Sequence, residues 1–252
     1  MIHMIRIIKE QEQYKGENGW LTTYHHFSFA EYYDPSKINF GPLRVFNDDV
    51  IQPGGGFDFH QHQDMEIVTY VIEGTLEHKD SLGNHGIVQP GEIQRMSAGT
   101  GVLHSEFNHS NEKPLRLLQI WLFSDTKGLN PSWEQKKYTR DDRKNKLLPV
   151  ISPKNASHKD MLAISQDATF YISNLENNAE LSYIPQKNRI TYLFVIEGRI
   201  ELNDKVLHTR DIAQIEDEQV LRIKSQIDTE LILIDLPINY LKNSFPVQIA
   251  KK

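Results

Sequence analysis

Two short segments carry the residues best suited to chemistry in this sequence. Residues 54–62 end in His60-Gln61-His62, and residues 99–106 end in His104-Ser105-Glu106. Side chains two positions apart in a β-strand project from the same face. In strands, His60 and His62 would therefore project together, and so would His104 and Glu106. If the two strands meet, three imidazoles and one carboxylate can surround a single metal ion.

This set of ligands is typical of a transition-metal site with room for a substrate. Imidazole and carboxylate together suit Fe(II), Mn, Co, Ni, Cu or Zn. Four protein ligands leave one or two positions open on an octahedral ion, as a catalytic ion requires. The chain contains no Cys, so thiolate ligands, disulfides and cysteine nucleophiles are excluded.

Glu66 is the main competitor for the carboxylate position, because it follows His62 by four residues. It could bind the ion, orient a ligand histidine, or belong to an unrelated salt bridge. Asp58 and Asp64 are weaker candidates for orienting the histidines. The other histidines have no partner at ligand spacing or lie in polar segments, and we expect them to be solvated or locally hydrogen-bonded. They are His3, His25, His26, His78, His85, His109, His158 and His208, of which His26 most needs a structural test.

Short β-strands must position these residues. Residues 65–73 (MEIVTYVIE) and 115–123 (LRLLQIWLF) are apolar and rich in β-branched and aromatic residues, and Gly, Pro and Asn punctuate the chain around them. This density of short strands is typical of a sandwich or barrel. We expect residues 1–8 to form the first strand and residues 132–138 to form a short helix after Pro131.

The sequence also contains an internal echo. Residues 69–74 (TYVIEG) resemble 192–198 (YLFVIEG), and residues 117–122 resemble 231–236. Two copies of one all-β unit explain both matches. We predict an N-terminal metal-binding barrel over residues 1–135, a polar linker over 136–160, and a C-terminal barrel over 161–252.

Composition limits the functional classes. The net charge of −6 argues against the basic face that direct nucleic-acid binding requires. The chain has no apolar run near the ~18 residues of a membrane span, and its first residues do not read as a secretory signal. We therefore expect a cytoplasmic protein that binds neither nucleic acid nor membrane.

The same segments resemble the two cupin motifs, with His60, His62 and Glu66 in the first and Pro90-Gly91 and His104 in the second. Residues 60–84 and 90–106 are more specifically similar to the pirin family. The resemblance implies a bicupin, an all-β chain with two cupin barrels (double-stranded β-helix, or jelly roll) in tandem. It also implies that the N-terminal barrel holds iron, with Fe(II) expected first, or another divalent ion. The implied ligands are His60, His62, His104 and Glu106.

The resemblance also separates the two carboxylates and the two barrels. Glu66 lies one residue closer to the histidines than in the commoner cupin pattern, which places it outside the ligand set. Counting back from Gly198, Ile184 and Gln186 stand where His60 and His62 would be, and residues 221–224 replace the His104 segment. We therefore predict a metal-free structural barrel at the C-terminus.

Some pirin-like proteins resemble quercetin 2,3-dioxygenases. The implied reaction is the oxidative ring opening of a flavonol such as quercetin by dioxygen, with release of carbon monoxide and with Glu106 as the catalytic base. Phe57, Phe59 or Phe107 could contact the flat substrate. Two alternatives remain: a metal- or redox-dependent regulatory protein that binds a protein partner, and another metal-dependent cupin reaction on a different small molecule.

Overall fold

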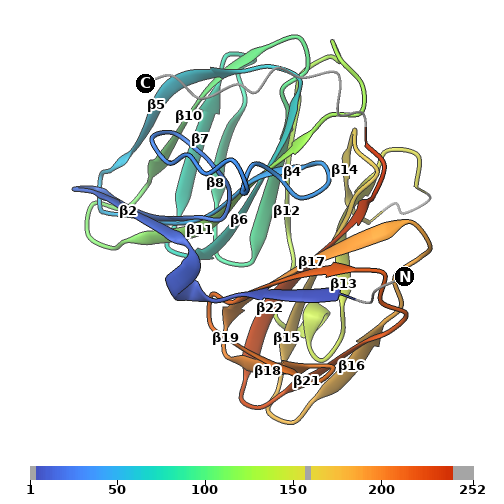
Figure 1. The fold of residues 1–252 in the computed structure, drawn as a ribbon. Coiled ribbons are helices and arrows are strands. Elements are labelled where there is room, and N and C mark those ends of the chain that lie inside the picture. Colours follow the sequence, from blue (N-terminus) through green and yellow to red (C-terminus); the bar gives the residue numbers. More distant parts are fainter. Residues whose placement is uncertain (1–3, 157–159, 241–252) are drawn as a thin grey trace. The chain divides into compact units, whose positions relative to one another are not determined.

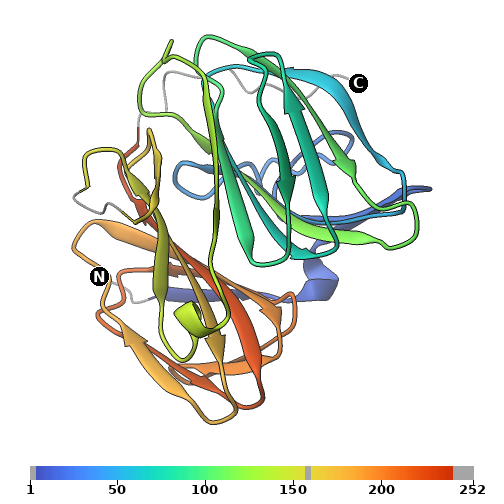
Figure 2. The same ribbon diagram turned by 180° about the vertical axis from the view of Figure 1, so that it is seen from behind.

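The structure, a computed structural model, describes residues 4–156 and 160–240. It consists almost entirely of β-strands, with two single-turn 3-10 helices at Glu10–Glu12 and Asp141–Arg143. The chain forms two compact units (Figure 1 and Figure 2). Residues 14–137 and 164–166 form the first, and residues 4–13, 138–156, 160–163 and 167–240 form the second. No helix among the described residues has the length and hydropathy of a membrane span.

The first unit contains a sheet of seven strands in the order β12-β9-β6-β11-β4-β3-β2 and a sheet of four in the order β5-β10-β7-β8. Its strands are β2 (Tyr14–Asn18), β3 (Leu21–His25), β4 (Leu43–Ile51), β5 (Gly56–His62), β6 (Met65–Glu73), β7 (Leu76–Asp80), β8 (His85–Val88), β9 (Glu92–Ser97), β10 (Val102–Asn108), β11 (Leu115–Phe123) and β12 (Ser132–Lys137).

The second unit repeats this arrangement, with the sheets β1-β20-β17-β22-β15-β13-β14 and β16-β21-β18-β19. Its strands are β1 (Met4–Ile8), β13 (Leu148–Pro153), β14 (Leu162–Ile164), β15 (Thr169–Leu175), β16 (Glu180–Tyr183), β17 (Arg189–Glu197), β18 (Arg199–Leu202), β19 (Lys205–His208), β20 (Ile212–Glu216), β21 (Leu221–Ser225) and β22 (Thr229–Pro237).

The internal echo falls on equivalent strands. β6 and β17 each lie between the equivalent pairs β9/β11 and β20/β22. Both strands are followed by a glycine in the left-handed region, Gly74 with φ 80° and Gly198 with φ 110°. A Cβ at Gly74 would come within 2.7 Å of the Leu115 Cα, and one at Gly198 would come within 2.7 Å of the Thr229 Cα. Only glycine tolerates both the backbone angle and this close approach. The prediction of two copies of one all-β unit is confirmed.

The edge strand next to β9 or β20 comes from a different part of the chain in each unit. β12 is the last strand of the first unit and pairs with β9, whereas β1, from the start of the chain, pairs with β20 from Met4↔Glu216 to Ile8↔Ile212. The expected first strand is confirmed over Met4–Ile8, and residues 1–3 lie outside the described part of the chain. The second unit thus includes residues 4–13, a feature that the predicted boundaries lack. The boundaries 1–135, 136–160 and 161–252 stay a prediction, because only independent folding of each part would test them.

The predicted helix over residues 132–138 is wrong, since Ser132–Lys137 is strand β12. Its residues pair with β9 from Ser132↔Ser97 to Lys137↔Glu92. The Arg95 side chain reinforces this pairing by bonding the Ser132 hydroxyl at 2.5 Å and the Glu134 carboxylate at 2.5 Å. Pairing with a neighbouring strand outweighs the weak local preference of a polar segment.

Candidate metal centre

The two histidine-bearing segments lie side by side as antiparallel strands β5 and β10. His104 stands directly opposite His60, and Val102 opposite His62. The His60 and His104 rings are 4.4 Å apart, and the His62 ring lies 4.8 Å and 4.9 Å from them. One nitrogen from each of the three side chains lies within 4.8 Å of the others. The alternation read from the sequence therefore brings these imidazoles to one point.

The hydrogen bonds of these histidines leave nitrogen lone pairs free. The His60 Nδ1 lies 2.8 Å from the Asp58 carbonyl oxygen. A carbonyl only accepts, so Nδ1 carries the proton and Nε2 keeps its lone pair. The buried His62 Nε2 and both His104 nitrogens have no protein partner. Burial lowers the pKa of each ring, that of His62 to about 3, so the imidazoles are neutral. Neutral, unpartnered imidazoles are the form that binds a metal, so the site fits a divalent ion.

Glu106 is buried behind His104 and held by donors from three strands. The Gln94 Nε2 donates to its Oε1 at 2.6 Å, and the Gln119 Nε2 donates to its Oε2 at 2.7 Å. The Thr69 hydroxyl lies 3.3 Å from Oε1. Burial raises the pKa of Glu106 to about 7, although these three donors oppose the rise. A carboxylate offers about four acceptor positions, so roughly one is left for an ion.

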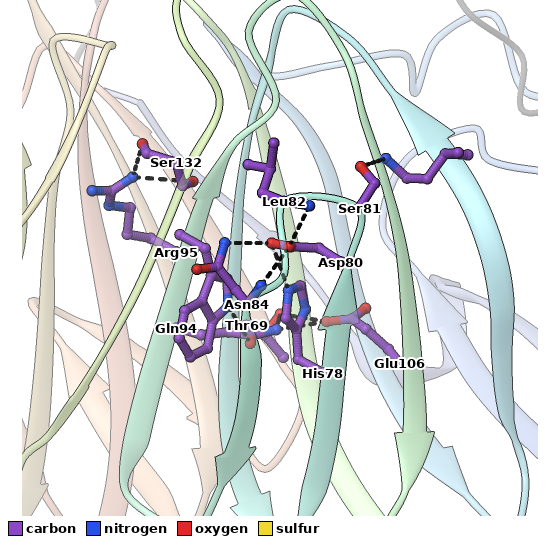
Figure 3. Close-up of polar contacts among 12 residues, drawn as sticks. Thr69, His78, Asp80, Ser81, Leu82, Asn84, Gln94, Arg95, Glu106 and Ser132 are labelled. Carbon is purple, nitrogen blue, oxygen red and sulfur yellow. Dashed lines mark hydrogen bonds and ion pairs between the residues drawn. The ribbon is translucent and has the colours of Figure 1, made fainter.

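A fourth buried histidine adjoins this carboxylate. His78 lies on β7 directly opposite Glu106, and His78, His104 and Glu106 form a second group of potential ligands within 4.8 Å of one another. The His78 Nε2 faces the Asp80 carboxylate at 3.4 Å, and its ring stacks on Trp133 at 5.2 Å. Figure 3 shows His78 and Glu106 side by side, with Asp80 beyond the histidine.

Sequence reasoning assigned His78 a solvated or locally bonded role. The bond to Asp80 agrees with the second part, but the side chain is fully buried and adjoins the candidate centre. Alternation within residues 76–80 was the available signal, because it puts His78 and Asp80 on the same face as the core residue Leu76.

Glu66 lies on the opposite face of β6 from Thr69, which contacts Glu106. Its carboxylate accepts a hydrogen bond from the Ser97 hydroxyl at 2.6 Å. Asp64 accepts a bond from the Gly128 amide at 2.7 Å, and Asp58 contributes only its backbone oxygen to His60. None of the three carboxylates belongs to either ligand group.

The remaining described histidines stay outside both ligand groups. His26 is buried and stacks on Phe46 at 4.6 Å, so it is a packed core residue. His25 is also buried and packs edge-on against Phe29 at 5.3 Å. His85, His109 and His208 are exposed, and His3 and His158 lie outside the described residues.

The three aromatic residues suggested as substrate contacts differ in position. Phe59 is 58% exposed. Phe57 packs against the apolar cluster of the barrel and lies 6.3 Å from the His60 ring. The Phe107 ring covers the backbone of Gly56 on β5. Phe57 therefore lies beside the His60 ring.

The second unit replaces the polar residues around Glu106 as a set. In the first unit, Thr69 pairs with both Gln94 and Gln119, and His78 pairs with Glu106. The same register positions of the second unit pair Leu193 with Ala213 and Leu233, and Leu202 with Ile223. These five residues are at most 1% exposed and belong to one apolar cluster. The fold therefore forms without the polar network, which the first unit retains at a cost in desolvation.

The predicted counterparts of the histidine pair, Ile184 and Gln186, follow strand β16. They line a cavity of about 660 Å³ together with Tyr183, Arg189 and Asp235. The segment 221–224 forms most of β21, in the position that β10 holds in the first unit. The metal-free character of this barrel stays a prediction.

Comparison with known proteins agrees with this architecture. Residues 7–122 match the family described as Pirin, and residues 150–236 match the family described as Quercetinase C-terminal cupin domain. The chain is 42% identical to an Escherichia coli protein named quercetin 2,3-dioxygenase, over 93% of this chain and 99% of that protein. It is also 42% identical to a pirin-like protein of Caulobacter vibrioides, over 87% and 94% of the two chains.

Solved structures of similar proteins also agree with the two-barrel architecture. The crystal structure of YhhW from Escherichia coli superposes with a TM-score of 0.89 at 40% identity and covers 94% of this chain and 100% of its own. A second structure of YhhW, described as a bacterial pirin in complex with nickel(II), gives a TM-score of 0.88 over 93% and 99% of the two chains. The prediction of a bicupin is confirmed, and the chain belongs to the pirin family.

Proposed function

We propose that this protein is a metal-dependent dioxygenase that opens the central ring of a flavonol with dioxygen and releases carbon monoxide. The observation that carries the proposal is the meeting of the half-buried His60 ring with the buried His62 and His104 rings, next to the buried Glu106 carboxylate, which forms a second potential ligand group with His104 and His78. Relatives named quercetin 2,3-dioxygenase support the substrate class. The native flavonol, or a related small aromatic molecule, is part of the proposal.

We propose His60, His62, His104 and Glu106 as the ligands of one divalent ion. The ion would act as a Lewis acid that favours the ionised form of a substrate hydroxyl. Glu106 is also the proposed catalytic base, because a carboxylate beside the ion can accept the proton of a substrate hydroxyl. Fe(II) is the ion expected first, and the nickel(II) complex of YhhW supports testing several metals.

The decisive experiment is anaerobic reconstitution of the full chain with Fe(II), Mn, Co, Ni, Cu or Zn, followed by addition of dioxygen and quercetin. We expect loss of the flavonol absorbance and stoichiometric carbon monoxide with at least one metal. His60→Ala and Glu106→Gln should abolish turnover, whereas Glu66→Gln, on the far face of β6, is the matched control and should retain it.

Absence of turnover with every metal, in protein that binds the ion stoichiometrically, would refute the proposed reaction. Recovery of a stoichiometric protein partner by the metal-loaded form would then favour the regulatory alternative. A cytoplasmic location stays part of this proposal, and cell fractionation would test it.

A further inference from the structure

Glu106 lies at the end of a short hydrogen-bonded chain that begins at an edge strand. The Trp133 Nε1 on β12 donates to the Gln94 Oε1 at 2.9 Å. The Gln94 Nε2 on β9 then donates to the Glu106 Oε1 at 2.6 Å. Figure 3 shows the Gln94 side chain directed toward Thr69 and Glu106. Trp133 therefore connects to the carboxylate through one amide group.

The indole fixes which end of that amide faces Glu106. An indole N–H can only donate, so it must face the carbonyl oxygen of Gln94. The amide NH₂ group is then directed at Glu106 and, at 3.1 Å, at the Thr69 hydroxyl oxygen. If the indole donor is lost, the amide can turn by 180° and present an oxygen to the carboxylate oxygen. Two facing acceptors repel, so the turned amide would push Glu106 away.

Trp133 is itself held in place on two sides. Its ring stacks on His78 with an interplanar angle of 12°. Its outer edge lies on the backbone of Gly86, where an added Cβ would overlap the ring. The bonds of Arg95 to Ser132 and Glu134 anchor β12 on either side of the indole. The indole N–H is therefore delivered to Gln94 by packing on a fixed strand.

The second unit provides an internal comparison. Ala213 replaces Gln94, Ile223 replaces Glu106, and the edge-strand position matching Trp133 is Ile5, opposite Ile215 as Trp133 is opposite Met96. The carboxylate, the amide and the indole are thus present together in one barrel and absent together from the other.

We propose that Trp133 is a positioning residue for the metal centre, acting through the Gln94 amide to direct the Glu106 carboxylate. The inference rests on the proposed role of Glu106 as a ligand. Residues that orient metal ligands typically contribute 10- to 100-fold in metal affinity or activity. We expect Trp133→Phe, which keeps an aromatic ring against His78 but lacks the donor, to weaken Co(II) binding by at least about 10-fold.

The test is a double-mutant cycle on the full-length chain, read by Co(II) titration and by the visible absorption spectrum of the bound ion. The variants are Trp133→Phe, Gln94→Met and the pair. Trp20→Phe is the matched control, because Trp20 packs edge-on against Phe57 at 5.0 Å and makes no bond to the Gln94 chain. Thermal unfolding of each metal-free variant measures any general loss of stability.

Three results would support the inference together. Trp133→Phe weakens Co(II) binding and alters the cobalt spectrum, Trp20→Phe does neither, and Trp133→Phe adds no further loss in the Gln94→Met background. The inference is overturned if Trp133→Phe binds Co(II) as Trp20→Phe does. It is equally overturned if the tryptophan substitution costs as much in the Gln94→Met background as in the unmodified chain.

Two further results distinguish a failure of the proposed function from a failure of this inference. If His60→Ala binds Co(II) with unchanged affinity and spectrum, the proposed centre is wrong, and the inference falls with it. If the cobalt results hold but no metal form consumes a flavonol, the proposed reaction is wrong while the role of Trp133 stands.

Discussion

Acidification should weaken metal binding mainly because it protonates Glu106. The pKa of Glu106 is raised to about 7, whereas that of His62 is lowered to about 3 and those of His60 and His104 are lowered as well. Metal binding requires deprotonated ligands. As the pH falls below 7, the Glu106 carboxyl of the metal-free centre therefore gains a proton that an incoming ion must displace.

The magnitude follows from that single proton. The dissociation constant should rise by the factor 1 + 10^(7 − pH), which is about 2 at pH 7 and about 30 at pH 5.5. Binding should thus be roughly 15-fold weaker at pH 5.5 than at pH 7, and nearly constant above pH 8. Co(II) titration at constant ionic strength, with calorimetry in two buffers of different ionisation enthalpy, measures both the slope and the proton count.

Glu106→Gln provides the control, because it should bind more weakly at every pH and lose the dependence on pH. A slope of two or more protons per ion in the unmodified chain would show that a group besides Glu106 releases a proton when the ion binds. A flat profile would show that the carboxylate is either already ionised or not a ligand. Either result would refute the reasoning.

Three further predictions concern residues around the centre and in the turns. Asp49 is buried, and burial raises its pKa from 3.8 to about 7, so the free energy of unfolding that it contributes below pH 3.8 is lost as the pH rises through 7. Asp49→Asn should therefore raise the free energy of unfolding by up to about 4 kcal/mol more at pH 8 than at pH 4, measured by chemical denaturation of the metal-free chain. Equal gains at both pH values would contradict this. Gly198→Ala should lower the free energy of unfolding by roughly 3 kcal/mol, and Gly83→Ala by about 1 kcal/mol. Both glycines have positive φ, but of the two only Gly198 has atoms within contact distance of an added Cβ. Similar losses in both variants would rule out this steric contact as the cause. Glu66→Gln should change the Co(II) affinity less than about twofold. The Glu66 carboxylate accepts a hydrogen bond from Ser97 on the face of β6 that points away from Glu106. A larger loss of affinity would place Glu66 in the metal centre.

The sequence predicted the parts of the structure that depend on local periodicity. Alternation within residues 60–62 and 104–106 was enough to predict which candidate ligands share a face, and the β-branched runs were enough to identify β6, β11, β17 and β22. The repeated VIEG motif identified equivalent strands, because each of them is followed by a backbone position with positive φ that favours glycine, so the same residue recurs in both copies.

The parts that depend on contacts between distant strands were not predicted. Gln94, Gln119 and Trp133 come from three strands, and nothing in their own neighbourhoods indicates that two of them bond Glu106 and the third bonds Gln94. β12 was misread as a helix because its partner β9 lies some 40 residues earlier. His78 was set aside because its partners His104 and Glu106 lie on another strand.

The course of the chain makes the metal-binding barrel an insertion. β1 is hydrogen-bonded to β20 before the first barrel begins, and β13 returns to the same sheet after β12 ends. The segment 14–137 is thus connected at both of its ends to the second unit. A protease that cuts once after Lys137 would therefore leave this barrel joined through Gln13 to β1, which stays paired with β20.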